Sequence, residues 1–320
     1  MNKLKIYISV LLAALMLTSC VGISETTDST DTSVVAPEPS PYGVIGVENA
    51  KEIWDVSCQY ALLTKLDGLE AVAKRNASEI MYPASMTKVM TFIVAYENAD
   101  SFDAQTELTK EIQNRYAHVG ASRVGIYEGT LMTTEQLLYA LLLESDTDSA
   151  VALAEYVAGG EEEFVKLMNA KCKELGLTST KFANITGLHD KEHYTTVEEM
   201  TSIFAYALGI ELFRKIITTD TYVTYLDYYE DGVLKNFRMT FKNTTISRDK
   251  GRFAKNNISL SFSNGAIIGG KTGYTDEAKY CLALLVKDAD GKEYILITAK
   301  SSTARDNAAD SLCICKEHIN

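Results

Sequence analysis

The sequence predicts a mixed α/β fold. One antiparallel sheet, built from both chain ends and flanked by helices, carries an inserted all-helical lobe at about residues 90–218. Two observations predict this arrangement. Strand-like stretches occur early in the chain and again after Thr221, whereas apolar residues at helical spacing occupy the middle. Hydrophobic residues make up 46% of the 320 residues, enough to fill a sizeable core. Strands at both ends with helices between them indicate a single sheet that the helical part interrupts.

The N-terminal residues predict segments outside this fold. A short basic stretch and an apolar run suit a secretory signal peptide at residues 1–19. The run ends in Leu17-Thr18-Ser19-Cys20, which resembles the lipobox of bacterial lipoproteins; the alternative is an ordinary signal peptide with an incidental cysteine. The resemblance implies lipidation of Cys20 and anchoring at the extracytoplasmic face of the cell membrane. Residues 20–45 then form a disordered tether, and residues 46–320 the folded domain.

The first elements of the domain are two strands and a buried helix. Cys58 to Leu66 and Leu69 to Ala73 are expected to be strands joined by a turn at Asp67-Gly68. The helix is expected to begin with Ser85 in its first turn. Its residues are apolar on nearly every side, which predicts a place in the core.

Capping signals divide the middle of the chain into helices. Thr133 with Gln136 resembles a capping box, Asp148 is a plausible cap, and Thr195 with Glu198 caps a later segment. The expected helices are Leu137–Leu143, Asp148–Ala158, Glu161–Leu175, a segment that ends near Gly209, and Glu211–Ile217.

After Thr221 the pattern changes to strands. Two aromatic and β-branched stretches on either side of Asp231-Gly232 predict a hairpin, and the polar, basic residues 242–257 predict a mobile loop. The remaining expected elements, four strands and a terminal helix, are Ile258–Ser263, Ala266–Thr272, Cys281–Lys287, Glu293–Lys300 and Ala304–Lys316.

Composition narrows the function. The formal net charge is -12, the pI is about 4.9 and no basic patch stands out, so we expect no nucleic-acid partner. Besides Cys20, five cysteines remain, and no pair of them has zinc-ligand spacing with histidines nearby. Because five is odd, at least one thiol has no partner within the chain, and we expect most of them to be small core residues.

Three short stretches carry the chemistry. In the first, Ser85 and Lys88 are three residues apart and share one helix face, so the lysine could be the base that a serine nucleophile needs. Burial and a nearby cation would both lower a lysine pKa. A solvated serine and lysine on a helix is the alternative interpretation, because Ser-x-x-Lys by itself is not specific. The second stretch carries Ser145 and Thr147 between two helices. The third is Gly269-Gly270-Lys271-Thr272-Gly273 on an expected strand, where glycines allow close approach of another backbone.

With all three stretches in this order, the chain resembles the penicillin-binding proteins and serine β-lactamases. Within that group it is most similar to the low-molecular-mass D-alanyl-D-alanine carboxypeptidases, peptidase family S11. Further stretches share the similarity, among them Ala121 to Gly125, Thr186-Gly187-Leu188 and Lys271 to Thr275. The resemblance implies a DD-peptidase/β-lactamase-like fold. It also implies hydrolysis of the terminal D-Ala of peptidoglycan stem peptides, with β-lactams as covalent inhibitors and no metal or other cofactor.

The resemblance also implies a role for each site residue. Ser85 would be the nucleophile, Lys88 its general base and Ser145 a proton shuttle. Lys271 and Thr272 would bind the terminal carboxylate of the substrate, with Gly273 and Tyr274 beside it on the same stretch. The backbone N–H groups of Ser85 and Tyr274 would form the oxyanion hole. Lys271 close to Lys88 would lower the pKa of Lys88.

One position departs from the family pattern. Thr147 stands where the family usually has asparagine, which can donate to a substrate amide and accept from Lys88 at once. This favours an alternative function, a catalytically weakened protein that binds muropeptides or β-lactams. A β-lactamase is a further alternative, but no convincing Glu-x-x-Leu-Asn occurs between Ser145 and Lys271. Hydrolysis of a stem-peptide mimic separates these readings.

Overall fold

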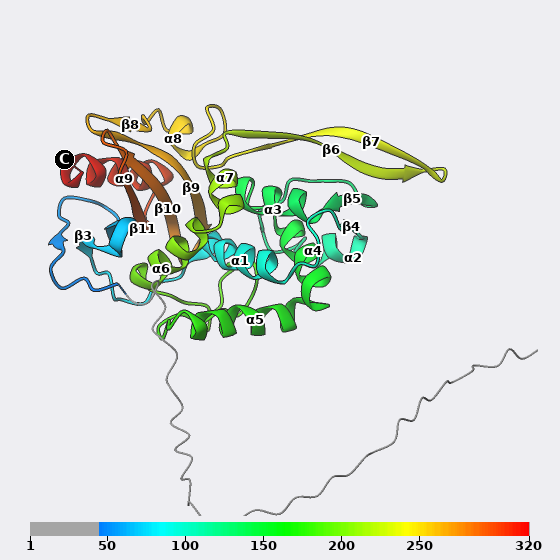
Figure 1. Cartoon of the computed structure of the whole chain (residues 1–320), viewed down its shortest axis with the longest axis horizontal. Coiled ribbons are helices and arrows are strands. Elements are labelled where there is room, and N and C mark those ends of the chain that lie inside the picture. Colours follow the sequence, from blue (N-terminus) through cyan, green and yellow to red (C-terminus); the bar gives the residue numbers. More distant parts are fainter. Residues whose placement is uncertain (1–44, 320) are drawn as a thin grey trace, which may run out of the picture. The chain divides into compact units, whose positions relative to one another are not determined.

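The computed structural model describes residues 45–319, in which two sheets and a set of helices surround the three stretches (Figure 1). The larger sheet has seven strands in the order β1-β3-β2-β11-β10-β9-β8. Its strands are β1 (Lys51–Glu52), β2 (Tyr60–Lys65), β3 (Ala71–Arg75), β8 (Ser261–Phe262), β9 (Gly265–Thr275), β10 (Lys279–Asp288) and β11 (Glu293–Ser301). Because β2 pairs with β11, the prediction of one sheet built from both chain ends is confirmed. All pairings in it are antiparallel except that of β1 with β3.

Helices cover both faces of the larger sheet, which explains the nearly continuous apolar sequence of its central strands. In β10, residues 281–286 are all fully buried. One face carries α9 (Ala304–His318), the other α6 (Val197–Leu208) (Figure 1). Two buried apolar clusters correspond to these faces. The third stretch lies on β9, which pairs with the buried strand β10 along its length.

The helical lobe is built around α1 (Lys88–Asn98), in which residues 88–95 are all buried. This confirms the prediction of a core helix, although Ser85 itself lies in a short 3-10 turn, Ala84–Thr87, directly before α1. The other helices are α2 (Lys110–Asn114), α3 (Thr134–Leu143), α4 (Thr147–Ala158), α5 (Glu161–Glu174), α7 (Glu211–Thr218) and the short α8 (Arg252–Lys255).

The prediction of an all-helical lobe is wrong in one respect, because the lobe contains two short strands. They are β4 (Gln105–Glu107) and β5 (Thr130–Thr133), and they extend the predicted hairpin of β6 (Thr221–Glu230) and β7 (Val233–Lys242) into a second sheet with the order β4-β5-β6-β7. Strands of three or four residues carry little periodic signal, so only their pairing with the hairpin defines them. The hairpin prediction is confirmed, and the two turn residues, Asp231 and Gly232, both have positive φ.

Two helix caps differ from the sequence prediction. The side chain of Asp146, not Asp148, caps α4 by accepting a hydrogen bond from the Ser149 N–H. Likewise α6 is capped by Thr196, one residue after the predicted Thr195. In both cases the sequence holds two suitable residues close together, and tertiary contacts select one of them. The capping box of Thr133 and Gln136 on α3 is confirmed.

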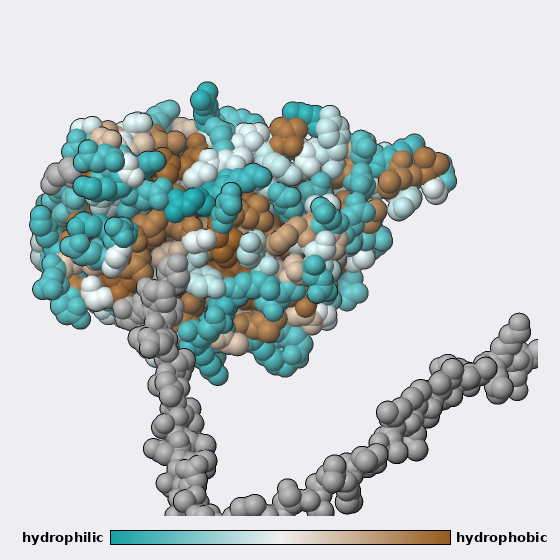
Figure 2. All heavy atoms as spheres, in the orientation of Figure 1, coloured by the Kyte–Doolittle hydropathy of each residue, from teal (hydrophilic) through white to brown (hydrophobic). Residues whose placement is uncertain are grey.

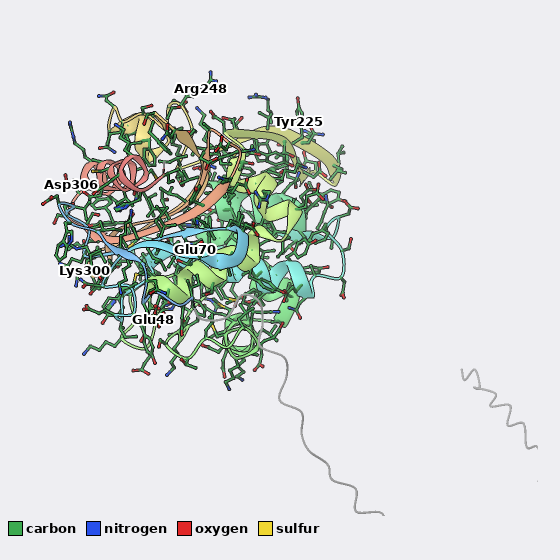
Figure 3. The ribbon with its side chains drawn as sticks, turned by 60° about the vertical axis from the view of Figure 1, so that its left-hand side comes forward. Glu48, Glu70, Tyr225, Arg248, Lys300 and Asp306 are labelled. Carbon is green, nitrogen blue, oxygen red and sulfur yellow. The ribbon has the colours of Figure 1, made fainter. Side chains whose placement is uncertain are left out.

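Residues 242–257 do not form the mobile loop that their polar sequence predicted. They include α8, and Asn243, Thr245 and Ser247 in this segment are buried. The Asn243 side chain donates to the carbonyl oxygens of Ile217 and Thr219 and accepts from the Thr245 N–H, so its buried amide is satisfied inside the fold. Only the outer residues face solvent; Arg248 here and Tyr225 on the hairpin are among the labelled exposed side chains (Figure 3).

The predictions for residues 1–19 and for Cys20 lie outside the described residues. Among the helices of residues 45–319, none combines the length and apolar character needed to span a bilayer.

The prediction that most cysteines are core residues is confirmed for the described part of the chain. Its five cysteines are all free, and only Cys313 is exposed.

Candidate active site

Ser85 and Lys88 meet at the junction of the short turn and α1. Lys88 is the first residue of α1 and is 1% exposed, whereas Ser85 remains partly accessible. The Lys88 Nζ atom lies 3.3 Å from Ser85 Oγ and donates to the Thr186 carbonyl oxygen at 2.9 Å. The predicted shared face is thus confirmed, and a buried amine lies beside an accessible hydroxyl.

The shape of the turn depends on a neighbouring glycine. Ala84 has a φ of 49°, which is uncommon for a residue with a Cβ. Gly187 packs so closely that a Cβ at its position would lie 1.9 Å from the Ala84 carbonyl oxygen. The stretch Thr186-Gly187-Leu188 therefore supports Ser85 from one side and supplies the carbonyl that holds Lys88.

Burial lowers the pKa of Lys88 to about 7, and the negative charge of Asp146 opposes this shift. A neutral amine is therefore accessible near neutral pH, as a general base requires. Of the two causes that the sequence suggests, burial and a nearby cation, burial is the one that lowers the pKa of Lys88. The pKa of Lys271 is lowered well below its usual range, first by burial and then by repulsion from Lys88 and Arg252.

The second stretch presents a serine hydroxyl without a partner. Ser145 lies between α3 and α4 with a φ of 60°, and its buried Oγ has no hydrogen-bond partner among the described residues. A buried hydroxyl left unpaired is costly, so this group is available to a further hydrogen-bond partner. Thr147 begins α4, is 1% exposed, and its N–H donates to the Ser122 carbonyl oxygen at 2.9 Å.

Asp146 fixes the loop that forms the opposite wall. Its Oδ1 accepts from the Val124 N–H at 2.8 Å, and its Oδ2 accepts from the N–H and the hydroxyl of Ser149. Next to it, Asp148 forms an ion pair with Arg123. Because a carboxylate has no N–H donor, Asp146 does not supply the amide donor that an asparagine at position 147 would offer.

The third stretch lies on β9 against the nucleophile turn. A Cβ at Gly273 would lie 3.1 Å from the Pro83 carbonyl oxygen and 3.3 Å from the Ser85 nitrogen, so the glycine permits this approach. Lys271 is fully buried, and its Nζ donates to the Thr272 carbonyl oxygen at 2.9 Å. The hydroxyl of Thr272 is 3.1 Å from that of Thr244, a neighbour in the segment that the sequence suggested to be mobile.

A narrow cleft joins these groups. It is lined by Ser85, Lys88, Gly120, Ala121, Ser122, Thr147, Thr186, Gly187, Leu188, Tyr274 and Thr275. Of the predicted site residues, Ser85, Lys88, Thr147 and Tyr274 line it, whereas Ser145, Lys271, Thr272 and Gly273 do not. Residues 120–122 and 186–188 were not assigned to the site from the sequence, although both stretches lie in or beside segments that resemble the family.

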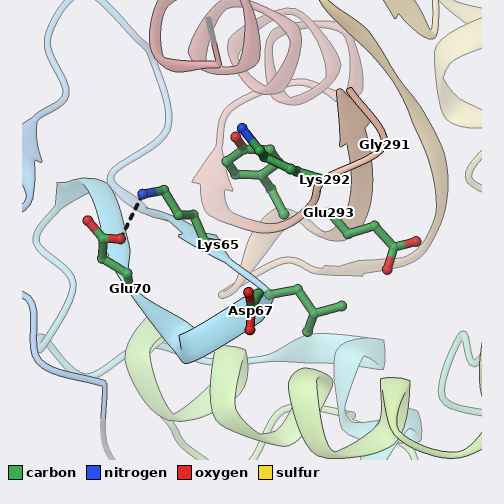
Figure 4. Close-up of a pocket in the computed structure, with 8 residues that line it drawn as sticks. Lys65, Asp67, Glu70, Gly291, Lys292 and Glu293 are labelled. Carbon is green, nitrogen blue, oxygen red and sulfur yellow. Dashed lines mark hydrogen bonds and ion pairs between the residues drawn. The ribbon is translucent and has the colours of Figure 1, made fainter. Parts of the chain in front are cut away.

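A larger cavity of about 640 Å³ lies elsewhere, beside the turns that follow β2 and β10 (Figure 4). Its polar lining includes Lys65, Asp67, Glu70, Lys292 and Glu293, and the Lys65–Glu70 ion pair occupies one side. None of the three stretches contributes to it, so size alone does not mark the reactive site.

His193 supports the nucleophile turn from inside. Its Nδ1 accepts from the Ala183 N–H at 3.1 Å, so Nε2 carries the proton and donates to the Thr87 hydroxyl at 2.7 Å. Burial lowers the pKa of His193 to about 4, which keeps the ring neutral. This is a structural role.

The site thus has the arrangement expected for the penicillin-binding proteins and serine β-lactamases that the sequence resembles: a partly accessible serine beside a buried lysine, an unpaired second serine, and a Lys-Thr-Gly strand against the Ser85 turn. The sequence profile of D-alanyl-D-alanine carboxypeptidase, Peptidase S11, matches residues 47–302. The chain belongs to this family.

Several characterised proteins are similar to it. The D-alanyl-D-alanine carboxypeptidase DacF of Bacillus subtilis is 32% identical over 248 residues, which are 78% of this chain and 59% of that protein. A D-alanyl-D-alanine carboxypeptidase of Streptomyces sp. strain K15 is 30% identical over 71% of this chain and 76% of that protein. The crystal structure of the Streptomyces K15 DD-transpeptidase superposes with a TM-score of 0.72 and 26% identity, covering 81% of this chain and 96% of the other. The chain thus spans about three fifths of the Bacillus relative's length.

Proposed function

We propose that this protein is a serine D-Ala-D-Ala carboxypeptidase that hydrolyses the terminal D-Ala of peptidoglycan stem peptides through an acyl-enzyme on Ser85. The observation that carries the proposal is the buried Lys88 amine 3.3 Å from the accessible Ser85 hydroxyl. Membership of the S11 family supports the choice of substrate.

In the acylation step, neutral Lys88 takes the Ser85 proton while Ser85 Oγ attacks the carbonyl carbon of the penultimate D-Ala. The N–H groups of Ser85 and Tyr274 stabilise the oxyanion. Ser145 then relays the proton from Lys88 to the departing amine, which leaves Lys88 neutral again and Ser145 a hydroxyl; free D-Ala leaves, and the acyl group remains as an ester on Ser85. Lys88 then deprotonates the water that hydrolyses this ester, and Lys88 returns the proton to Ser85 Oγ. The unpaired hydroxyl of Ser145 supports its assignment as the shuttle.

Lys271 and Thr272 are proposed to bind the terminal carboxylate of the substrate. A carboxylate next to Lys271 would offset its burial and favour the charged ammonium, raising its lowered pKa. The same carboxylate position suits a β-lactam, so β-lactams should acylate Ser85. Gly273 serves by permitting β9 to approach the nucleophile turn.

Thr147 favours a second candidate function, a weakened protein that binds muropeptides or β-lactams and turns them over slowly or not at all. Release of D-Ala from a synthetic stem pentapeptide separates the two. The carboxypeptidase proposal predicts D-Ala release by the chain and none by Ser85→Ala. Stable acylation by penicillin without D-Ala release would contradict it and favour the binding protein.

We further propose that Cys20 is lipidated and anchors the protein at the extracytoplasmic face of the cell membrane. The lipobox-like Leu17 to Cys20 and the location of peptidoglycan outside the membrane support this.

A further inference from the structure

A second cleft, which we call the aromatic cleft, lies between the end of the 119–129 loop and the β6–β7 hairpin. It is lined by Tyr127, Glu128, Thr130, Tyr228 and Phe237 and has a volume of about 300 Å³. That volume is at the lower end of the range for small-molecule sites, about 300–1,000 Å³. Apolar side chains gather toward the end of this hairpin (Figure 2).

The aromatic cleft combines exposed rings with one unpaired hydroxyl, that of Thr130. Tyr127 is 75% exposed, and its ring meets Phe237 edge-on at 6.1 Å between centroids; Tyr228 meets the same ring at 6.0 Å. Thr130, opposite Tyr228 in the sheet, is 1% exposed, and its hydroxyl has no hydrogen-bond partner among the described residues. Aromatic walls with a few polar groups are typical of a site for a small, partly apolar ligand.

We propose that the aromatic cleft binds a sugar ring of the peptidoglycan glycan strand, an inference that rests on the proposed function. A pyranose offers an apolar C–H face that can lie on Tyr127 and hydroxyls that can donate to the Glu128 carboxylate. The unpaired Thr130 hydroxyl is available as a further polar group in the wall.

The reach of the substrate fits this assignment. Ser122 lines the narrow cleft beside Ser85, here called the catalytic cleft, and Tyr127 lines the aromatic cleft. Because Tyr127 follows Ser122 by five residues, their Cα atoms lie within about 18 Å of each other. A stem pentapeptide in extended form spans about 14 Å from its attachment to its scissile bond. The two lengths are of the same order, so the sugar that carries a stem peptide bound in the catalytic cleft lies in the range of the aromatic cleft.

The direct test is binding of a peptide-free tetrasaccharide of alternating N-acetylglucosamine and N-acetylmuramic acid to the full chain in detergent, measured by calorimetry. Tyr127→Ala should weaken binding about tenfold. Tyr229→Ala is the matched control, because Tyr229 is 63% exposed on the opposite face of the hairpin and does not line the cleft. Equal affinities of the two variants would overturn the proposal.

A second variant guards against a merely structural effect. Thr130→Val removes an unpaired buried hydroxyl, so it should preserve or raise thermal stability. On our proposal it nevertheless weakens tetrasaccharide binding. If neither Thr130→Val nor Tyr127→Ala changes the affinity for the tetrasaccharide, the cleft is not a sugar site. The proposal would also be overturned if the parent sediments as a dimer and Tyr127→Ala as a monomer, because a second copy of the chain would then fill the cleft.

Kinetics separate this inference from the proposed function. The measured quantity is kcat/KM for a disaccharide-linked pentapeptide divided by kcat/KM for the sugar-free pentapeptide. Tyr127→Ala should lower this ratio about tenfold and Tyr229→Ala should not. A chain that cleaves both substrates with a ratio insensitive to Tyr127→Ala keeps the proposed function and overturns the inference. A chain that cleaves neither but binds the tetrasaccharide through Tyr127 overturns the proposed function and upholds the sugar site.

Discussion

At the scale of single residues, the proposed catalysis requires the Lys88 amine to be neutral at the pH of the reaction. Lys88 reaches this state mainly by burial at the first turn of α1, while Asp146 limits the shift. The two effects place its pKa near 7, where a base combines sufficient basicity with a large neutral fraction.

This predicts a pH profile. Because the pKa of Lys88 is lowered to about 7, the neutral form dominates above that pH and the protonated form below it. The acylation rate should therefore fall about tenfold per unit as pH drops below 7 and level off above it. The measurement is acylation by a chromogenic β-lactam between pH 5 and 9. Lys88→Arg, which stays charged, should be inactive throughout. An acylation rate that keeps rising beyond pH 9 would show that burial does not lower the pKa of the general base to about 7.

A second prediction concerns Thr147. The neighbouring Asp146 caps α4 and holds Val124, but its carboxylate has no N–H to donate and so does not replace the absent asparagine. Loss of one hydrogen bond to a buried group costs about 1–3 kcal/mol, or roughly tenfold to a hundredfold in rate. Thr147→Asn should raise acylation and peptide hydrolysis by that factor with little change in thermal stability. A variant no faster than the parent would refute the idea that Thr147 is a handicap.

Residue-level prediction from the sequence succeeded where the chemistry is local. Ser85 and Lys88 share a face because their spacing dictates it. The cap of α4 was misassigned because Asp146 and Asp148 are both suitable and only the distant Val124 and Arg123 distinguish them.

At the scale of elements, the site is a meeting of three segments that glycines allow to touch. Gly187 accommodates the Ala84 carbonyl, and Gly273 brings β9 against the Ser85 turn. The geometry of the nucleophile therefore depends on two positions that carry no chemistry of their own.

Gly187→Ala should misplace the nucleophile turn. A Cβ would lie 1.9 Å from the Ala84 carbonyl oxygen at a glycine with a φ of 86°, so the backbone must move. Misplacement of about 1 Å can cost roughly a hundredfold in rate, and we expect at least that loss in acylation. Gly159→Ala is the control: its φ is also positive, but no atom lies within 4 Å, so it should cost only about 1 kcal/mol in stability and leave acylation intact. Similar acylation by both variants would refute this role of Gly187.

Elements with local signals were predicted from the sequence, and those defined by distant partners were not. The hairpin at Asp231-Gly232 and the capping box at Thr133 follow from adjacent residues. The order of residues 242–257 comes instead from distant contacts, such as the Thr244 N–H donating to the Leu143 carbonyl and the Lys242 N–H donating to Glu144. No periodicity within residues 242–257 indicates these hydrogen bonds to distant residues.

At the scale of the whole molecule, the sheet built from both chain ends brings together residues that are distant in sequence. Gly273 on β9 reaches Ser85 because β9 pairs with β10, β10 with β11, and β11 with β2 near the start of the domain. The larger sheet follows from the order of the elements along the chain, so it could be predicted. The second sheet could not, because its strands β4 and β5 are too short to recognise in the sequence.

Membrane anchoring is the prediction that concerns the full chain. Lipidation requires the sulfur of Cys20, so Cys20→Ser should fail to incorporate labelled fatty acid and accumulate as precursor. Cys313→Ser, which removes the exposed cysteine of the folded domain, is the control and should be labelled like the parent. Equal labelling of the parent and Cys20→Ser would show that the lipobox interpretation is wrong.

Covalent chemistry at Ser85 can be tested by mass spectrometry after incubation with penicillin. We expect the chain to gain the mass of one penicillin, mapped by peptide digestion to Ser85, and Ser85→Ala to gain none. An adduct on another residue, or an undiminished adduct in Ser85→Ala, would contradict it.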